Sequence, residues 1–223
     1  SVAVQFTYPL DPDTEYSIDV ADVQSTAGGP SGSLTHQFHT GTPPIYLLQR
    51  RAGVDAVFSS NLAGDTAVPV FEAEQIEDFR SARNGLVALT TAGGLSELTA
   101  VSSTSGETTP IALPGSGFVS GLQVADHAGL LGYVFTDEAV GTPGAVESML
   151  FLGSITDPES DPVQISVGAD PRVQQCAFVP QTSYLLVLTF DGQLHLVDAS
   201  DLEADPVPLG IAAAIVGVEH GSG

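Results

Sequence analysis

The 223-residue chain contains no lysine and only five arginines, against 27 aspartates and glutamates. Its formal net charge at pH 7 is therefore -22. Nucleic acids and anionic membrane surfaces are bound through lysine and arginine, so this balance disfavours both partners. Cationic ligands and calcium remain compatible with it. An acidic surface by itself predicts only a soluble protein.

Cysteine is almost absent as well. The single residue, Cys176, excludes an internal disulfide and is too little for a thiolate zinc site. It is followed by the apolar residues 177–179, so we expect a small core residue and not a reactive thiol. No stretch matches a signal peptide or a membrane span, so we expect no membrane insertion. Because the chain starts at Ser1, we expect it to be part of a longer one.

What the sequence does contain is apolar residues that alternate with polar ones. Hydrophobic residues make up 43% of the chain and charged residues 14%, which predicts a folded core. Period-two alternation is clearest in residues 2–8, 16–20 and 34–38. Clusters of Gly, Pro and Asp separate such runs, and no run keeps a helical period. We therefore predict an all-β protein.

The first 42 residues contain a turn at 11–13, a Tyr-containing run at 14–18, a Gly-rich loop at 28–30 and a closing run that ends in Phe38-His39-Thr40. This order resembles the C-terminal part of a bacterial Ig-like domain. The resemblance implies a partial Ig-like β-sandwich segment over residues 1–42. About 40 residues cannot bury a two-sheet core alone, so we expect the segment to pack on a neighbour or to be a fragment.

From residue 43 onward the chain repeats itself. Four segments, at residues 45–70, 86–113, 130–165 and 185–209, each predict three strands joined by turns. Shorter extended runs at 76–79, 119–122, 173–176 and 215–218 add one strand to each unit. Four antiparallel strands per 40 to 55 residues resembles the bacterial β-propeller superfamily, although the chain has no tryptophan and no motif of the WD type. We predict a β-propeller of four-stranded blades, with about four repeats, over residues 43–223.

The last of these runs, residues 215–218, would be the first strand of a unit, whereas the repeats begin with a second strand. Pairing of the two would close a ring of four blades. The alternative is a larger ring whose other blades lie outside this chain.

No constellation of residues predicts catalysis, a cofactor site or a metal site. His36 and His39 are three apart on an expected strand and point to opposite faces, which argues against a shared metal. His127, His195 and His220 are isolated, and we expect His195 to face solvent or to be hydrogen-bonded.

Calcium is the metal that the oxygen-rich loops at residues 11–15, 157–161 and 198–205 would suit best, but none matches a known calcium motif and we expect solvated turns. Ser116 lacks a nucleophile elbow, and adjacent Glu77 and Asp78 should point apart on a strand.

Three functions stay open. The first is a non-enzymatic binding or scaffolding module of an exported or cell-surface bacterial protein, located outside the cell, at its surface or in the periplasm, with a protein or carbohydrate ligand. The second is a propeller-type extracellular hydrolase or lyase that acts on a polysaccharide or lactone. The third is a structural segment of a large surface assembly. The analogy of fold favours the first.

Overall fold

Strands make up nearly all of the regular structure in the computed structural model, which describes residues 14–23, 32–39, 45–60, 67–82, 84–138, 148–168, 172–212 and 214–215. The chain divides into two units, residues 1–47 with 58–68 and residues 48–57 with 69–223. Within the described residues, no helix is long and apolar enough to cross a membrane.

The first unit contains an antiparallel hairpin of β1 (Glu15–Val23) and β2 (Gly32–His39). Tyr16 pairs with Phe38 across it, as the strand alternation predicts. His36 and His39 both lie on β2. The argument against a metal shared by the two assumed that they lie on one strand. The Ig-like resemblance and the predicted boundary after residue 42 stay predictions.

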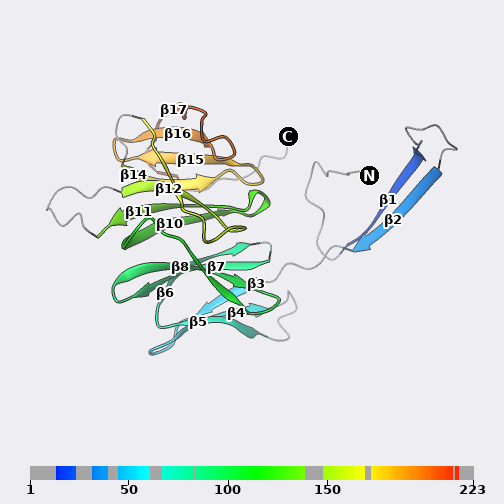
Figure 1. Ribbon diagram of the computed structural model, residues 1–223, viewed down its shortest axis with the longest axis horizontal. Coiled ribbons are helices and arrows are strands. Elements are labelled where there is room, and N and C mark those ends of the chain that lie inside the picture. The colour runs from blue at the N-terminus through cyan, green and yellow to red at the C-terminus, as the bar shows by residue number, and fades with distance from the viewer. Residues whose placement is uncertain are drawn as a thin grey trace. The chain divides into compact units, whose positions relative to one another are not determined.

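Among the described residues, the remaining strands form one sheet of three strands and three sheets of four, each in simple sequential order (Figure 1). We call them blades 1 to 4. Blade 1 has β3 (Ile45–Gln49), β4 (Asp55–Ser60) and β5 (Val68–Ala73). Blade 2 has β6 (Ile76–Ala82), β7 (Gly85–Ala92), β8 (Leu95–Ser102) and β9 (Thr108–Ile111). Blade 3 has β10 (Gly117–Ala125), the short 3-10 helix η1 (Asp126–Ala128), β11 (Leu130–Asp137), β12 (Ser148–Ser154) and β13 (Val163–Ile165). Blade 4 has β14 (Val173–Phe178), β15 (Tyr184–Thr189), β16 (Gln193–Asp198) and β17 (Val207–Ile211).

The prediction of an all-β chain with four-stranded antiparallel units is thereby confirmed. The runs at 76–79, 119–122 and 173–176 supply the first strands β6, β10 and β14, as expected. Residues 216–218, which the predicted ring closure needs, lie outside the described part of the chain, so closure stays a prediction.

Blade 3 is buried on both faces, which explains its nearly continuous apolar strands. On β11, Leu131, Tyr133 and Phe135 join a buried cluster shared with blade 2, while Val134 joins one shared with blade 4. Alternate side chains of a strand point to opposite faces, so two neighbouring sheets leave no polar face between them. The Phe151 ring stacks at 6.1 Å from Tyr133 in the first cluster.

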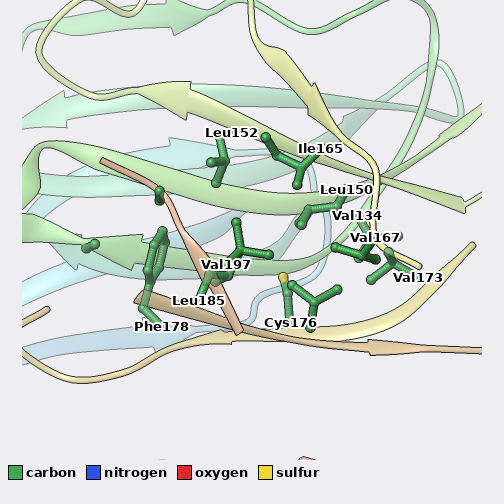
Figure 2. Packing of buried hydrophobic residues seen from close by; sticks show 13 residues of the cluster. Val134, Leu150, Leu152, Ile165, Val167, Val173, Cys176, Phe178, Leu185 and Val197 are labelled. Carbon is green, nitrogen blue, oxygen red and sulfur yellow. The ribbon is translucent and has the colours of Figure 1, made fainter. Parts of the chain in front are cut away.

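The cluster between blades 3 and 4 contains residues from all four strands of blade 3 and from three strands of blade 4. Figure 2 shows Leu150 and Leu152 of blade 3 together with Phe178 and Leu185 of blade 4. Full burial of one such side chain contributes about 1.5 to 3 kcal/mol to stability. Packing between blades is therefore the main force that positions the loops described next.

Candidate functional site between neighbouring blades

The first strand of each four-stranded blade contains a β-bulge. Against its second strand, the register shifts between Ile76 and Asp78 in blade 2, between Ser120 and Gln123 in blade 3, and between Val173 and Gln175 in blade 4. A bulge adds one residue to one strand and takes a carbonyl out of the regular ladder. Polar groups thus become available at the joints between blades.

Both neighbours of blade 3 use the carbonyls of its bulge. Arg80 Nε of blade 2 donates a hydrogen bond of 2.9 Å to the carbonyl of Leu122. Cys176 Sγ of blade 4 donates one of 3.4 Å to the carbonyl of Gly121. These two bonds, which we call the bulge latch, fix the strand that runs directly into η1.

A pocket of about 620 Å³ lies where loops of blades 2 and 3 meet. Its blade 2 wall is made by the β6–β7 and β8–β9 connections, and its blade 3 wall by η1 and the residues after β12. The lining includes Asn84, Ser105, Glu107, Asp126, His127 and Thr156. We call it pocket 1.

Hydrogen bonds between loops hold each wall of pocket 1. In blade 2, the Ser103 N–H donates to the Asn84 carbonyl at 2.8 Å. In blade 3, the Ile155 N–H donates to the Gly129 carbonyl, also at 2.8 Å. Each wall is therefore a pair of connections tied together.

Two glycines allow the loops of pocket 1 to approach so closely. Gly85 has φ of 153°, and a Cβ there would lie 1.8 Å from the Val101 carbonyl oxygen. Gly129 has φ of 66°, and its Cβ would lie 2.9 Å from Thr156 Cγ2. Both positive φ values favour glycine, and the first contact excludes any side chain.

Pocket 2, of about 390 Å³, lies on the other side of η1. It shares Asp126 and His127 with pocket 1, and its blade 4 side is formed by Phe178 at the end of β14 and by residues 179–182 of the β14–β15 connection. The turn at Asp126 and His127 thus lies between the two pockets, and we call it the ridge.

Two serines that line pocket 1 are hydrogen-bonded within their own turn. Ser102 Oγ accepts a hydrogen bond from the Ser105 N–H, and Ser105 Oγ accepts one from the Glu107 N–H. These hydroxyls thus stabilise their own turn. Among the described residues, no group of three or more His, Cys, Asp or Glu could hold a metal ion.

The structure corrects one sequence prediction. His195 was expected to face solvent or to be hydrogen-bonded, but it is only 6% exposed and neither ring nitrogen has a hydrogen-bond partner among the described residues. Its ring lies close to Gly168. Alternation correctly separates it from Leu194 and Leu196, but that side of β16 is covered by blade 3 and is not open to water.

Other residues considered at the sequence level behave as structural groups. Cys176 is buried, and burial raises its pKa to about 12, as expected for a core thiol. Glu77 and Asp78 have separate partners, Thr91 for the first and Arg80 for the second. Ser116 lies just before β10, and its carbonyl accepts the Glu138 N–H at 3.0 Å.

The carboxylate of Asp198, in the oxygen-rich loop at 198–205, accepts hydrogen bonds from the hydroxyls of Ser200 and Ser183. The Ser200 hydroxyl is the main cause of a lowered pKa of Asp198. In the loop at 157–161, Ser160 bonds back to the Asp157 carbonyl. Both loops thus fold as self-bonded turns. The expectation that these loops are solvated turns without calcium stays a prediction, and residues 11–13 and His220 lie outside the described chain.

Solved structures share this architecture. The uncharacterized protein lmo1340 from Listeria monocytogenes is 13% identical, with a TM-score of 0.53 over 77% of this chain and 51% of its own. TolB from Acinetobacter baumannii is 6% identical, with a TM-score of 0.56 over 81% of this chain and 47% of its own. The chain has a β-propeller-like fold. At these identities the likeness extends to fold alone, and the chain spans about half the length of both proteins. No family model matches it, and no curated protein matches its sequence.

Proposed function

We propose that this chain is a non-enzymatic binding or scaffolding module that receives its partner at η1, across pockets 1 and 2. The observation that supports the proposal most is that both walls of pocket 1 are tied by hydrogen bonds between loops. A site that is already formed loses little conformational entropy when a ligand binds. The serines of pocket 1 serve as turn acceptors, which further favours binding over catalysis.

We also propose that the module acts outside the cytoplasm, at the cell surface or in the periplasm. Two features support this location. The net charge of -22 keeps an exposed protein soluble and monomeric. The one thiol is buried, so an oxidising compartment has no accessible cysteine to cross-link. Protease digestion of intact cells and of spheroplasts, read out on an epitope-tagged chain, tests the location.

A pocket-filling variant tests the site. Ala128 is exposed and lines pocket 1, so Ala128→Trp should block the pocket without disturbing the core. Ala204→Trp adds the same ring at an exposed turn that lines neither pocket. Both variants and the parent are screened by ligand-observed NMR against cationic and anionic peptides and neutral oligosaccharides. Binding that Ala128→Trp abolishes and Ala204→Trp retains supports the site. Equal binding by all three proteins would refute it.

A further inference from the structure

Asn84 and Gly85, at the turn between β6 and β7, bring together an amide side chain and a backbone nitrogen without a neighbouring side chain. Asn84 is exposed, and Gly85 is the first residue of β7. The nitrogen that follows an asparagine can attack the side-chain amide carbon, and glycine permits this most readily because no Cβ shields its nitrogen. The chain has one other asparagine, Asn61, and the bulkier Leu62 follows it. Asn84 is therefore the asparagine at which this attack is least hindered.

The fold itself requires glycine at this position. Gly85 has φ of 153°, which favours glycine, and a Cβ there would lie 1.8 Å from the Val101 carbonyl oxygen. No residue with a side chain fits in that space. The nitrogen that follows Asn84 is thus kept unshielded by the pairing of β7 with β8 (Leu95–Ser102).

Ser103 places two hydrogen-bond donors on the peptide group that joins Asn84 to Gly85. Its N–H donates to the Asn84 carbonyl oxygen at 2.8 Å, and its Oγ donates to the same oxygen at 3.2 Å. The Gly85 nitrogen becomes a nucleophile when it loses its proton, and the resulting negative charge is shared with this carbonyl oxygen. Two donors at that oxygen stabilise the charge, as the donors of an oxyanion hole do. The hydrogen bonds of Ser103 therefore favour the reactive form.

Water reaches this peptide group from pocket 1, which both Asn84 and Gly85 line. Gly85 is itself buried, and it pairs with Ala82 in the last pair between β6 and β7. The end of a ladder opens at a lower free energy than its centre. We expect the Gly85 nitrogen to react when this end pair is open.

We propose that Asn84 is a site of spontaneous modification, at which the backbone converts the side-chain amide into a carboxylate. The Gly85 nitrogen forms a bond to Asn84 Cγ and loses its proton. The bond from Cγ to the side-chain nitrogen breaks, and this nitrogen leaves as ammonia with that proton. Water then opens the succinimide ring at either carbonyl and gives aspartate or isoaspartate. The reaction needs only water, so it does not depend on the proposed function.

Both products change pocket 1. Aspartate adds a carboxylate to a lining that already contains Glu107 and Asp126. Isoaspartate lengthens the main chain by a methylene group directly before Gly85, where the Val101 carbonyl leaves no room. Modification therefore makes pocket 1 more acidic, and the isoaspartate product loosens the β6–β7 turn.

Peptide mapping of the full chain after incubation at neutral and at alkaline pH tests the proposal. Cleavage after glutamate at mildly acidic pH releases residues 78–97, which contain Asn84 but not Asn61. We expect two product peptides of equal, increased mass, formed at a rate that rises with hydroxide concentration. Conversion should be about tenfold or more faster than at Asn61, whose following leucine shields the nitrogen. Conversion of Asn84 in the folded chain that is no faster than that of Asn61 overturns the proposal.

A pair of serine variants tests the part played by Ser103. Ser103 is exposed, and Ser103→Ala removes one of the two donors to the Asn84 carbonyl, so it should slow conversion of the folded chain about fivefold. The Ser105 hydroxyl accepts the Glu107 N–H instead, so Ser105→Ala should leave the rate within about twofold. In denaturant both variants should match the parent, because the Ser103 bonds exist only in the folded chain. Conversion of folded Ser103→Ala as fast as the parent, or a slowing that persists in denaturant, would overturn the activation by Ser103.

Discussion

Asp55→Ala should destabilise the protein more than any other loss of a single carboxylate among the described residues. Asp55 begins β4, and its side chain is 7% exposed. Its Oδ2 accepts a hydrogen bond of 3.1 Å from the Ile76 N–H, at the first residue of β6. The same oxygen accepts one of 3.1 Å from Arg50 Nη1. Arg50 Nη2 in turn donates to the Ile76 carbonyl, so both polar groups of Ile76 depend on this pair.

The two hydrogen bonds to Asp55 contribute differently to the free energy of unfolding. The Arg50 side chain is 57% exposed, so its ion pair with Asp55 contributes about 0.5 to 1 kcal/mol after solvent screening. The Ile76 N–H is buried, and removing its charged acceptor costs about 2 to 3 kcal/mol. We therefore expect Asp55→Ala to lower the free energy of unfolding by about 3 kcal/mol. Asp55→Asn keeps an acceptor oxygen for Ile76, so it should lose about 1 kcal/mol.

Urea unfolding followed by circular dichroism measures both variants, and a change in midpoint at constant slope reports stability. Amide hydrogen exchange at Ile76 gives a local readout, which should accelerate strongly in Asp55→Ala and weakly in Asp55→Asn. Asp205→Ala removes an exposed carboxylate and should stay within about 0.5 kcal/mol of the parent. If Asp55→Ala is as mild as that control, the Ile76 N–H has another acceptor and the reasoning is refuted.

Three further outcomes follow from the structure. His195→Leu should raise the free energy of unfolding by about 1 kcal/mol, because it removes a buried imidazole without a described partner; a loss of similar size in urea unfolding would show that the ring is hydrogen-bonded. Gly85→Ala should cost more than about 3 kcal/mol, since its Cβ would meet the Val101 carbonyl at 1.8 Å; near-parent stability in the same assay would contradict that geometry. Cys176, buried and with its pKa raised to about 12, should resist iodoacetamide at pH 8 in the folded protein and react in denaturant; rapid alkylation of the folded state, followed by mass spectrometry, would argue against its burial.

The repeat and the strands could be predicted from the sequence because each blade encodes them locally. Apolar alternation and turn residues at fixed spacing identify a strand without knowledge of its neighbours, as the runs at 119–122 and 173–176 illustrate. The environment of His195 could not be predicted in this way. Alternation assigns His195 to one face of β16, but only the packing of blade 3 decides whether that face is wet.

The pockets were missed for a similar reason. Asn84, Ser105 and Asp126 are ordinary turn residues, and nothing in their local sequence distinguishes them from solvated turns. They become a site through contacts between connections that lie tens of residues apart. The one available signal was the repeat itself: aligned blades place the connections after the first strands on a common edge, where neighbouring blades bring them together.

The bulges relate blade packing to the candidate site. A regular ladder would use the carbonyls of Gly121 and Leu122 within blade 3, whereas the bulge leaves them for Cys176 and Arg80 in the blades on either side. Only a few residues separate this latch from η1, the ridge between the two pockets. Any rotation of one blade against the next would strain the latch and shift the ridge. The latch therefore adds to the apolar packing that positions the two pockets, and a partner that fills both would in turn stabilise the packing of blades 2, 3 and 4.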